Sequence, residues 1–268
     1  MSERAYEDKI FDPELERVRQ ADKFPSRVST GFLAQEMTRI DGRPKVLDVG
    51  SGSNPTLGEV IHSLGGIYIG LDLDPFNTHL ENIQKGGVEN VIRANVVSLP
   101  IAEKGVEITH TRALLAFIRP EERKVAIGEI LRSTSNTAIF IEYDYTKTES
   151  WGGVAAEFMT ALLKTLKRVG FDPYYGQYID QDVNESLTDL GKEAEVEVKP
   201  ISRTAGGYYK EMLVRAQELS GVAEKIGDSE SMRTFERVIG QIDTPEKRRK
   251  LPHFKTPDAR AVIVRFKD

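Results

Sequence analysis

The feature that most constrains the fold of this chain is an apolar run that leads into a glycine loop and then into a helix start, over residues 46–55. The start of this run reads as a buried strand, while Gly50 and Gly52 allow the backbone to turn sharply and to approach a ligand closely. Asn54 can cap the following helix, and Pro55 suits the first position of that helix. Because the N-terminus of a helix attracts anions, the pattern predicts an α/β protein that binds an anionic group of a nucleotide cofactor at this loop.

A second apolar run, over residues 67–72, ends in a carboxylate. Asp72 lies 20 residues beyond Gly52. At that distance, an acidic residue at the tip of the second strand of a Rossmann-like unit accepts both hydroxyl groups of a ribose. The two runs together therefore predict a cofactor that contains adenosine.

The details of the glycine loop separate two kinds of adenosine cofactor. A nicotinamide site favours G-x-G-x-x-G, whose third glycine allows helix and strand to pack closely, and Pro55 occupies that place here. Asp48 instead stands two residues before Gly50 and produces the pattern D-x-G-x-G. This pattern resembles motif one of the class I S-adenosylmethionine-dependent methyltransferases, and the resemblance extends over residues 40–200.

The resemblance implies S-adenosyl-L-methionine as the cofactor and assigns residues to its parts. Asp72 is expected to bind the ribose. Leu73, Asn95 and Val96 are expected to flank the adenine, and although the family usually has Asp at position 95, an Asn carbonyl can still accept from the adenine amino group. The cofactor-binding set that the resemblance implies, with the glycine loop beside the methionine part, is Asp48, Gly50, Ser51, Gly52, Asn54, Pro55, Asp72, Leu73, Asn95, Val96 and Arg112.

Further apolar and alternating runs complete a sheet. We expect strands over residues 90–94, 137–143, 192–202 and 259–266, and a strand with the loop that follows it over residues 106–115. Helices are expected over residues 119–132 and 151–172. The expected fold class is α/β, with a doubly wound, mostly parallel seven-stranded sheet that is flanked by helices and whose last strand is antiparallel.

Three parts of the chain are expected from this pattern. Residues 1–40 are charged and helix-prone and are expected to form an N-terminal helical cap, and the methyltransferase-like core is expected over residues 41–202 and 256–268. Residues 203–255 form a helical insertion before the last strand, either a structural helical pair or a lid over a substrate. The two apolar faces expected in the insertion are Tyr208, Met212, Leu213 and Leu219 on one helix, and Met232, Phe235, Val238, Ile239 and Ile242 on the other.

Composition narrows the classes of function. The chain has 268 residues, of which 39% are hydrophobic, so it can bury a sizeable core. A net charge of −5 argues against a general nucleic-acid binder, and the lack of cysteine excludes disulfides and thiolate chemistry. Neither a signal peptide nor a membrane span of about 18 apolar residues is expected. We therefore expect a soluble cytoplasmic enzyme with a small-molecule substrate and no nucleic-acid or membrane partner.

Candidate catalytic and substrate-binding residues follow two of the expected strands. His110, at the end of the fourth expected strand, is a candidate general base, or alternatively a packing or cofactor-side residue. Arg112 is placed to meet a carboxylate of the cofactor or an anion of the substrate. The candidate substrate-binding residues, which are alternatively a capped strand end with surface tyrosines, are Glu142, Tyr143, Asp144 and Tyr145. No set of residues with the spacing of a metal site is present in the sequence.

Methyl transfer from a sulfonium is an in-line displacement, for which the protein must align the nucleophile and the methyl group. We predict such a transfer to a small metabolite or natural product. The alternatives are a protein or peptide acceptor, and a domain that binds the cofactor or a partner without turnover. A short-chain-type oxidoreductase is suggested by the spacing of Tyr143 and Lys147, but that pair needs a helix, whereas Tyr143 is expected to end a strand.

Overall fold

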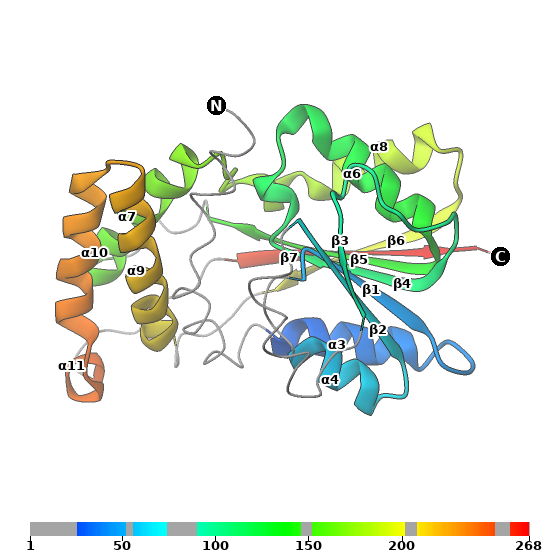
Figure 1. Ribbon diagram of the computed structural model, residues 1–268, viewed down its shortest axis with the longest axis horizontal. Coiled ribbons are helices and arrows are strands. Elements are labelled where there is room, and N and C mark those ends of the chain that lie inside the picture. The colour runs from blue at the N-terminus through cyan, green and yellow to red at the C-terminus, as the bar shows by residue number, and fades with distance from the viewer. Residues whose placement is uncertain are drawn as a thin grey trace. The chain divides into compact units, whose positions relative to one another are not determined.

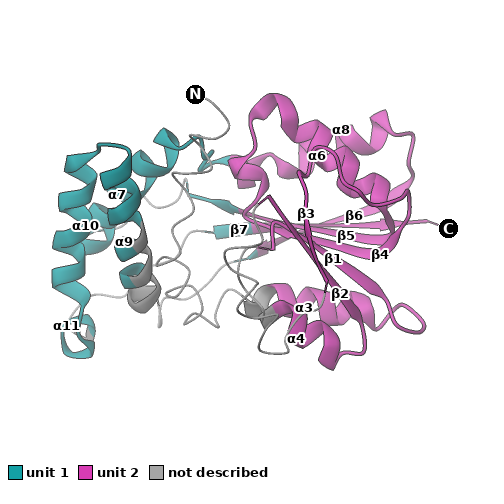
Figure 2. Ribbon diagram, viewed as in Figure 1, with its two compact units in different colours: residues 1–22, 143–174, 201–259 teal, residues 23–142, 175–200, 260–268 magenta. Residues whose placement is uncertain are grey.

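The computed structural model describes residues 26–51, 56–73, 90–145, 152–201, 208–249 and 258–267. The chain separates into two compact units, which Figure 2 colours teal and magenta. Unit 1 comprises residues 1–22, 143–174 and 201–259, and unit 2 comprises residues 23–142, 175–200 and 260–268. In this division the helix that follows the fifth strand belongs to unit 1 together with the helices before the last strand.

A single seven-stranded sheet forms the centre of unit 2, in the order β3-β2-β1-β4-β5-β7-β6 (Figure 1). The strands are β1 (Lys45–Val49), β2 (Ile67–Asp72), β3 (Val91–Arg93), β4 (Val106–Arg112), β5 (Thr134–Asp144), β6 (Ala194–Ile201) and β7 (Asp258–Phe266). β1 pairs in parallel with β2 on one side and with β4 on the other. The last strand is antiparallel, so the predicted fold class is confirmed.

The apolar runs form strands because both faces of the sheet are covered. In β1, residues 46–49 are all buried, and in β5 residues 137–142 are all buried. Strands that are buried on both faces read as continuous apolar runs, which is typical of parallel sheets. β4 ends at Arg112, and the next residue, Ala113, turns the backbone with a φ of 52°, so the expected segment over residues 106–115 contains the strand and the start of the loop that follows it.

Described helices lie on both faces of this sheet (Figure 1). One pair is α3 (Ser26–Met37) with α4 (Thr56–Ser63), and the other is α6 (Pro120–Ser133) with α8 (Ile179–Asp189). Arg265 of β7 binds Glu36 of α3 through two hydrogen bonds, of 2.8 and 2.7 Å, and the Glu36 side chain is almost fully buried. This bidentate pair attaches α3 to the sheet, and α3 in turn supplies a residue to the site described below.

Unit 1 is helical and contains α7 (Gly153–Arg168), α9 (Tyr208–Lys225), α10 (Ser229–Ile242) and α11 (Pro245–Arg249). The rings of Phe158 and Phe235, both fully buried, meet edge to face with centroids 6.2 Å apart. The members of the two expected apolar faces are buried or partly buried in this core, apart from Tyr208, whose side chain lies outside the described part of the chain. The insertion therefore shares its core with α7.

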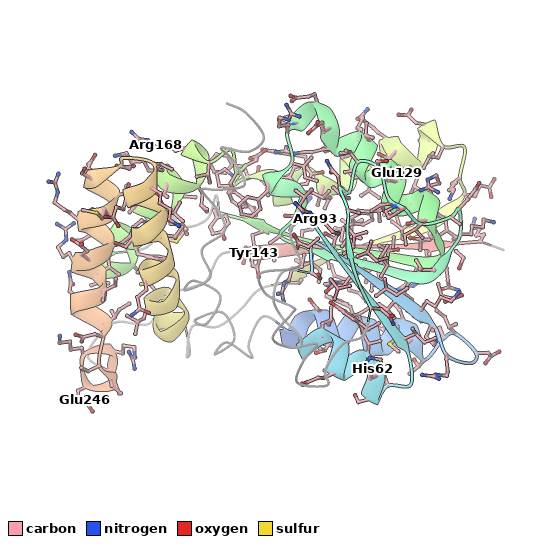
Figure 3. The ribbon with its side chains drawn as sticks, viewed as in Figure 1. His62, Arg93, Glu129, Tyr143, Arg168 and Glu246 are labelled. Carbon is pink, nitrogen blue, oxygen red and sulfur yellow. The ribbon has the colours of Figure 1, made fainter. Side chains whose placement is uncertain are left out.

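Charged residues tie the helices of unit 1 together. Asp228 caps α10 by accepting hydrogen bonds from the backbone N–H and the hydroxyl group of Ser231, and Lys164 and Arg168 of α7 lie 3.3 and 3.4 Å from its carboxylate. Figure 3 labels Arg168 on α7. At the other end of α10, Lys247 donates to the carbonyl of Gly240 at 2.7 Å. This part of the basic run over residues 247–250 thus caps a helix, as positive charges near a helix C-terminus do.

Within the ranges given above, no helix has the length and apolarity needed to cross a membrane. In the same ranges, no cluster of three or more His, Cys, Asp or Glu side chains is arranged to hold a metal ion.

Candidate functional site

The loop after β1 requires glycine at its first position. Gly50 has a φ of +72°, in the left-handed region, and the backbone N–H groups of Gly50 and Ser51 both donate to the carbonyl of Leu71 at the end of β2. A Cβ at Gly50 would lie 2.9 Å from a methyl carbon of Leu114, in the loop after β4. Gly52, Asn54 and Pro55 lie outside the described residues, so their predicted contacts with the cofactor stay predictions.

Three side chains from neighbouring strands form a buried chain of hydrogen bonds. Asp48 is in register with Gly70 on one side and with His110 on the other. Its carboxylate lies 2.8 Å from Nδ1 of His110 and accepts from the hydroxyl group of Tyr68 at 3.2 Å. Burial and, next, the nearby Asp48 charge raise the pKa of Tyr68 well above its ordinary value, so this phenol is a donor.

Gly70 makes room for this arrangement, since a Cβ there would lie 3.0 Å from the Tyr68 hydroxyl oxygen. Because an ionised carboxylate only accepts, the Nδ1–H of His110 donates to Asp48, and Nε2 is the ring nitrogen left for another partner.

A small pocket opens beside this chain of hydrogen bonds, at the carboxyl ends of β1 and β4. Its lining residues, all in unit 2, are Ser29, Asp48, Gly50, Ser51, Leu57, His110 and Arg112. Among the described residues, two buried polar atoms of this lining have no hydrogen-bond partner: Oγ of Ser29 and Nε2 of His110. Buried polar atoms are rarely left without a partner, so this set points to a polar ligand.

Arg112 adds a positive charge to the same pocket. Its side chain is half-buried, and within the described part of the chain no hydrogen bond or ion pair engages its guanidinium group. A partly buried guanidinium favours a carboxylate or phosphate, to which it can donate two parallel hydrogen bonds. With Asp48 nearby, the pocket presents both signs of charge, which suits a zwitterionic group such as an α-amino acid.

The end of β2 carries the predicted ribose-binding residue. Asp72 is the last residue of β2 and lies on the same face of the strand as Tyr68 and Gly70, because side chains alternate along a strand. Arg93 of β3, labelled in Figure 3, donates to the carbonyl of Leu73 at 2.9 Å, and Ala94 donates to the carbonyl of Asp72 at 3.0 Å. The backbone that carries Asp72 is therefore held from both β1 and β3.

The residues predicted to flank the adenine lie after β2 and β3. Leu73 is exposed, Val96 is buried, and the exposed Asn95 accepts a hydrogen bond of 3.2 Å from the backbone N–H of Val97. An amide oxygen has two lone pairs, so this contact leaves one of them for a ligand. The placement of these residues at the adenine stays a prediction.

The structure corrects the interpretation of Glu142 as a substrate-binding residue. Its side chain is fully buried, and Oε1 accepts hydrogen bonds from the backbone N–H groups of Leu114 at 3.0 Å and Leu115 at 2.8 Å. The desolvation that accompanies burial raises the pKa of Glu142 to about 8, although these N–H groups oppose the shift. Glu142 thus faces the loop after β4 and is shielded from any ligand in solution.

This raised pKa predicts a pH-dependent stability. An ordinary Glu has a pKa of 4.5, so between about pH 4.5 and 8 the folded protein binds more protons than the unfolded chain. As the pH rises through this window, we expect Glu142 to lower the free energy of unfolding by up to about 1.4 kcal/mol per pH unit. Glu142→Gln should remove this contribution. Urea unfolding of both proteins at about pH 5 and about pH 8 measures the difference, and parallel pH dependences would refute the assignment.

The other candidates, at the end of β5 and directly after it, belong to unit 1. Tyr143, labelled in Figure 3, and Tyr145 are half-buried with ring centroids 6.1 Å apart, and Tyr145 meets Phe171 edge to face at 6.1 Å. Asp144 is half-buried. Substrate contacts by these three residues stay a prediction. Tyr143 lies in β5 and not in a helix, which argues against the pairing with Lys147 that hydride chemistry requires.

Two residues of the site, Tyr68 and Ser29, could not be predicted from the sequence. Tyr68 read as one apolar residue of a buried strand, and its bond to Asp48 depends on the register of β2 against β1. Ser29 lies in a helix that was expected only as part of a cap. The lack of a hydrogen-bond partner for the Ser29 hydroxyl group, among the described residues, is visible only once α3 is placed against the sheet.

Comparisons with known proteins bear on the fold. No protein-family model matches the sequence, and no curated protein matches it. Among solved structures, an S-adenosylmethionine-dependent methyltransferase from Archaeoglobus fulgidus superposes with a TM-score of 0.52 at 13% identity, over 89% of this chain and 93% of that one. Phosphoethanolamine N-methyltransferase 2 from Haemonchus contortus, in complex with S-adenosyl-L-methionine, superposes with a TM-score of 0.55 at 11% identity.

The Haemonchus match covers 90% of this chain and 53% of the larger protein. The cyclase SpnF also superposes, with a TM-score of 0.53 at 16% identity over 88% of this chain and 80% of that one. The strand order and these likenesses agree with the resemblance found in the glycine loop. The chain therefore has the fold of the class I S-adenosylmethionine-dependent methyltransferases.

Proposed function

We propose that this protein is an S-adenosylmethionine-dependent methyltransferase that acts on a small metabolite or natural product. The observation that carries the proposal is the pocket with unpartnered polar groups at the carboxyl ends of β1 and β4. The order of the strands reverses between these two strands, and open α/β sheets bind their ligands at such a switch point.

The residues present fit the methionine part of the cofactor. Arg112 would receive its carboxylate, and the buried carboxylate of Asp48 would favour its ammonium group. The turn at Gly50 allows the backbone to approach the ligand, and Asp72 would bind the ribose. Bound S-adenosylmethionine supplies a methyl group on a sulfonium, and the protein holds the acceptor in line with it.

The proposal is tested first by calorimetric titration of the protein with S-adenosylmethionine, S-adenosylhomocysteine and NAD. Binding of the first two alone is the expected result and leaves the acceptor to be found among small molecules. Binding of NAD alone would overturn the proposal. Binding without turnover on any acceptor would favour the alternative of a domain that does not transfer a methyl group. The fold alone does not fix the reaction, since one structure with this fold is a cyclase. Turnover on peptides alone would favour the alternative of a protein acceptor.

His110 is proposed as the base that accepts a proton from the acceptor. Asp48 holds Nδ1, so Nε2 is the atom that would receive the proton. We expect His110→Asn, whose amide can still donate to Asp48, to keep S-adenosylhomocysteine binding and to lose turnover by about 10²- to 10⁴-fold. A matched change, His62→Asn on the exposed end of α4, should alter neither. If His110→Asn instead weakens binding and spares turnover at saturation, His110 is a cofactor-side residue, the alternative that the sequence left open.

A further inference from the structure

The loop after β4, residues 113–118, holds a strained backbone position. Ala113 has a φ of 52°, which residues with a side chain rarely adopt, and its N–H donates to the carbonyl of Ile141 at 2.8 Å. A short 3₁₀ helix, η1 (Leu115–Phe117), follows before α6 begins. Strained positions persist where the surrounding structure holds them in place, and they occur often at functional sites.

Two buried ionisable side chains form hydrogen bonds with the backbone of this loop. Glu142 accepts from the N–H groups of Leu114 and Leu115, while Nε of Arg123 donates to the carbonyls of Leu115 at 3.1 Å and Ile118 at 3.0 Å. Arg123 is only 6% exposed and lies over the ring of Tyr175, with its guanidinium carbon 4.3 Å from the ring centroid. The loop backbone is therefore clamped through both its donors and its acceptors.

The clamp acts on the glycine loop through one side chain. Leu114 lies so close to Gly50 that a Cβ at Gly50 would be 2.9 Å from Cδ1 of Leu114. A shift of the Leu114 backbone would move this contact, and Gly50 lines the pocket. Burial of a carboxyl group is costly, and Oε2 of Glu142 has no partner among the described residues, so general stability is a poor reason for a glutamate at this position.

We propose that Glu142 is a positioning residue, which fixes the backbone of Leu114 and Leu115 and thereby holds Leu114 against Gly50 to shape the cofactor pocket. The inference rests on the proposed function for the identity of the ligand. The charge of Glu142 is not required, since one neutral carbonyl oxygen can accept both N–H groups. Glutamine should therefore replace it, whereas leucine, similar in size but without an acceptor, should not.

Two measurements on Glu142→Gln and Glu142→Leu test the proposal. The first is amide hydrogen exchange at Leu114 and Leu115, which needs no ligand and reports on the clamp alone. The second is the affinity for S-adenosylhomocysteine. We expect Glu142→Gln to match the native protein in both, and Glu142→Leu to speed exchange at these two amides and to weaken binding by about tenfold or more. A role in stability alone would lower the melting temperature of the leucine variant without changing its affinity below that temperature.

Each outcome bears on one claim. Fast exchange in Glu142→Leu with unchanged affinity would overturn the positioning role, and unchanged exchange would overturn the clamp. Failure of the native protein to bind S-adenosylhomocysteine would instead count against the proposed function. If Glu142→Leu does not fold, Leu114→Ala removes the contact with Gly50 without a buried polar change, and unchanged affinity in that variant would overturn the inference.

Discussion

Replacement of Asp72 by alanine is expected to weaken the binding of S-adenosylhomocysteine by about 10²- to 10⁴-fold. The carboxylate at the end of β2 would accept two charge-assisted hydrogen bonds from the ribose hydroxyls, each worth about 1.5–3 kcal/mol. Calorimetric titration of the native and variant proteins measures the difference. Unchanged affinity would refute the ribose assignment.

A second ligand and a second variant show which part of the cofactor each residue binds. 5′-Methylthioadenosine keeps the ribose but lacks the amino acid, so Asp72→Ala should weaken its binding by a similar factor. Arg112→Ala should weaken the binding of S-adenosylhomocysteine but not that of 5′-methylthioadenosine, because Arg112 is assigned to the carboxylate of the methionine part. Asp41→Ala, an exposed carboxylate before β1, is the matched control and should bind both ligands as the native protein does. If Arg112→Ala weakens the binding of both ligands equally, the pocket does not hold the methionine part.

The second large effect is expected in unit 1, where Phe235→Ala should lower the free energy of unfolding by about 3–5 kcal/mol. Phe235 is fully buried and packs edge to face on Phe158, so truncation leaves a cavity among α7, α9 and α10. Urea unfolding followed by circular dichroism measures the loss. Glu236→Ala, an exposed neighbour on α10, should change stability by less than about 0.5 kcal/mol. Equal losses in the two variants would mean that this core does not stabilise the unit.

The same variant tests how far unit 1 serves ligand binding. The described residues that line the pocket all belong to unit 2. We therefore expect folded Phe235→Ala protein to bind S-adenosylhomocysteine with unchanged affinity. A parallel loss of affinity and of stability would contradict this expectation and would favour the lid among the two readings of the helical insertion.

Local sequence determined most of the sheet. Continuous apolar runs predicted β1, β2 and β5, because a strand that is buried on both faces needs apolar side chains on both. The alternation of apolar and polar residues over residues 259–266 predicted β7. The apolar faces of α9 and α10 followed from helical spacing in the same way. Gly50 predicted a tight turn, and its positive φ confirms that turn.

Contacts between distant segments were decided only by the tertiary structure. Glu142 is the last residue of a continuous buried run in β5, and only the path of the loop after β4 shows that it faces Leu114 and Leu115 rather than a substrate. The bond from Asp48 to His110 joins residues 62 positions apart and exists because β1 and β4 pair in one register. A strand pattern specifies which side chains share a face, but which partner each polar group meets depends on register and packing across the chain. The sequence by itself therefore determined the sheet and the glycine loop, and the tertiary structure decided which polar groups line the pocket and which hold it in shape.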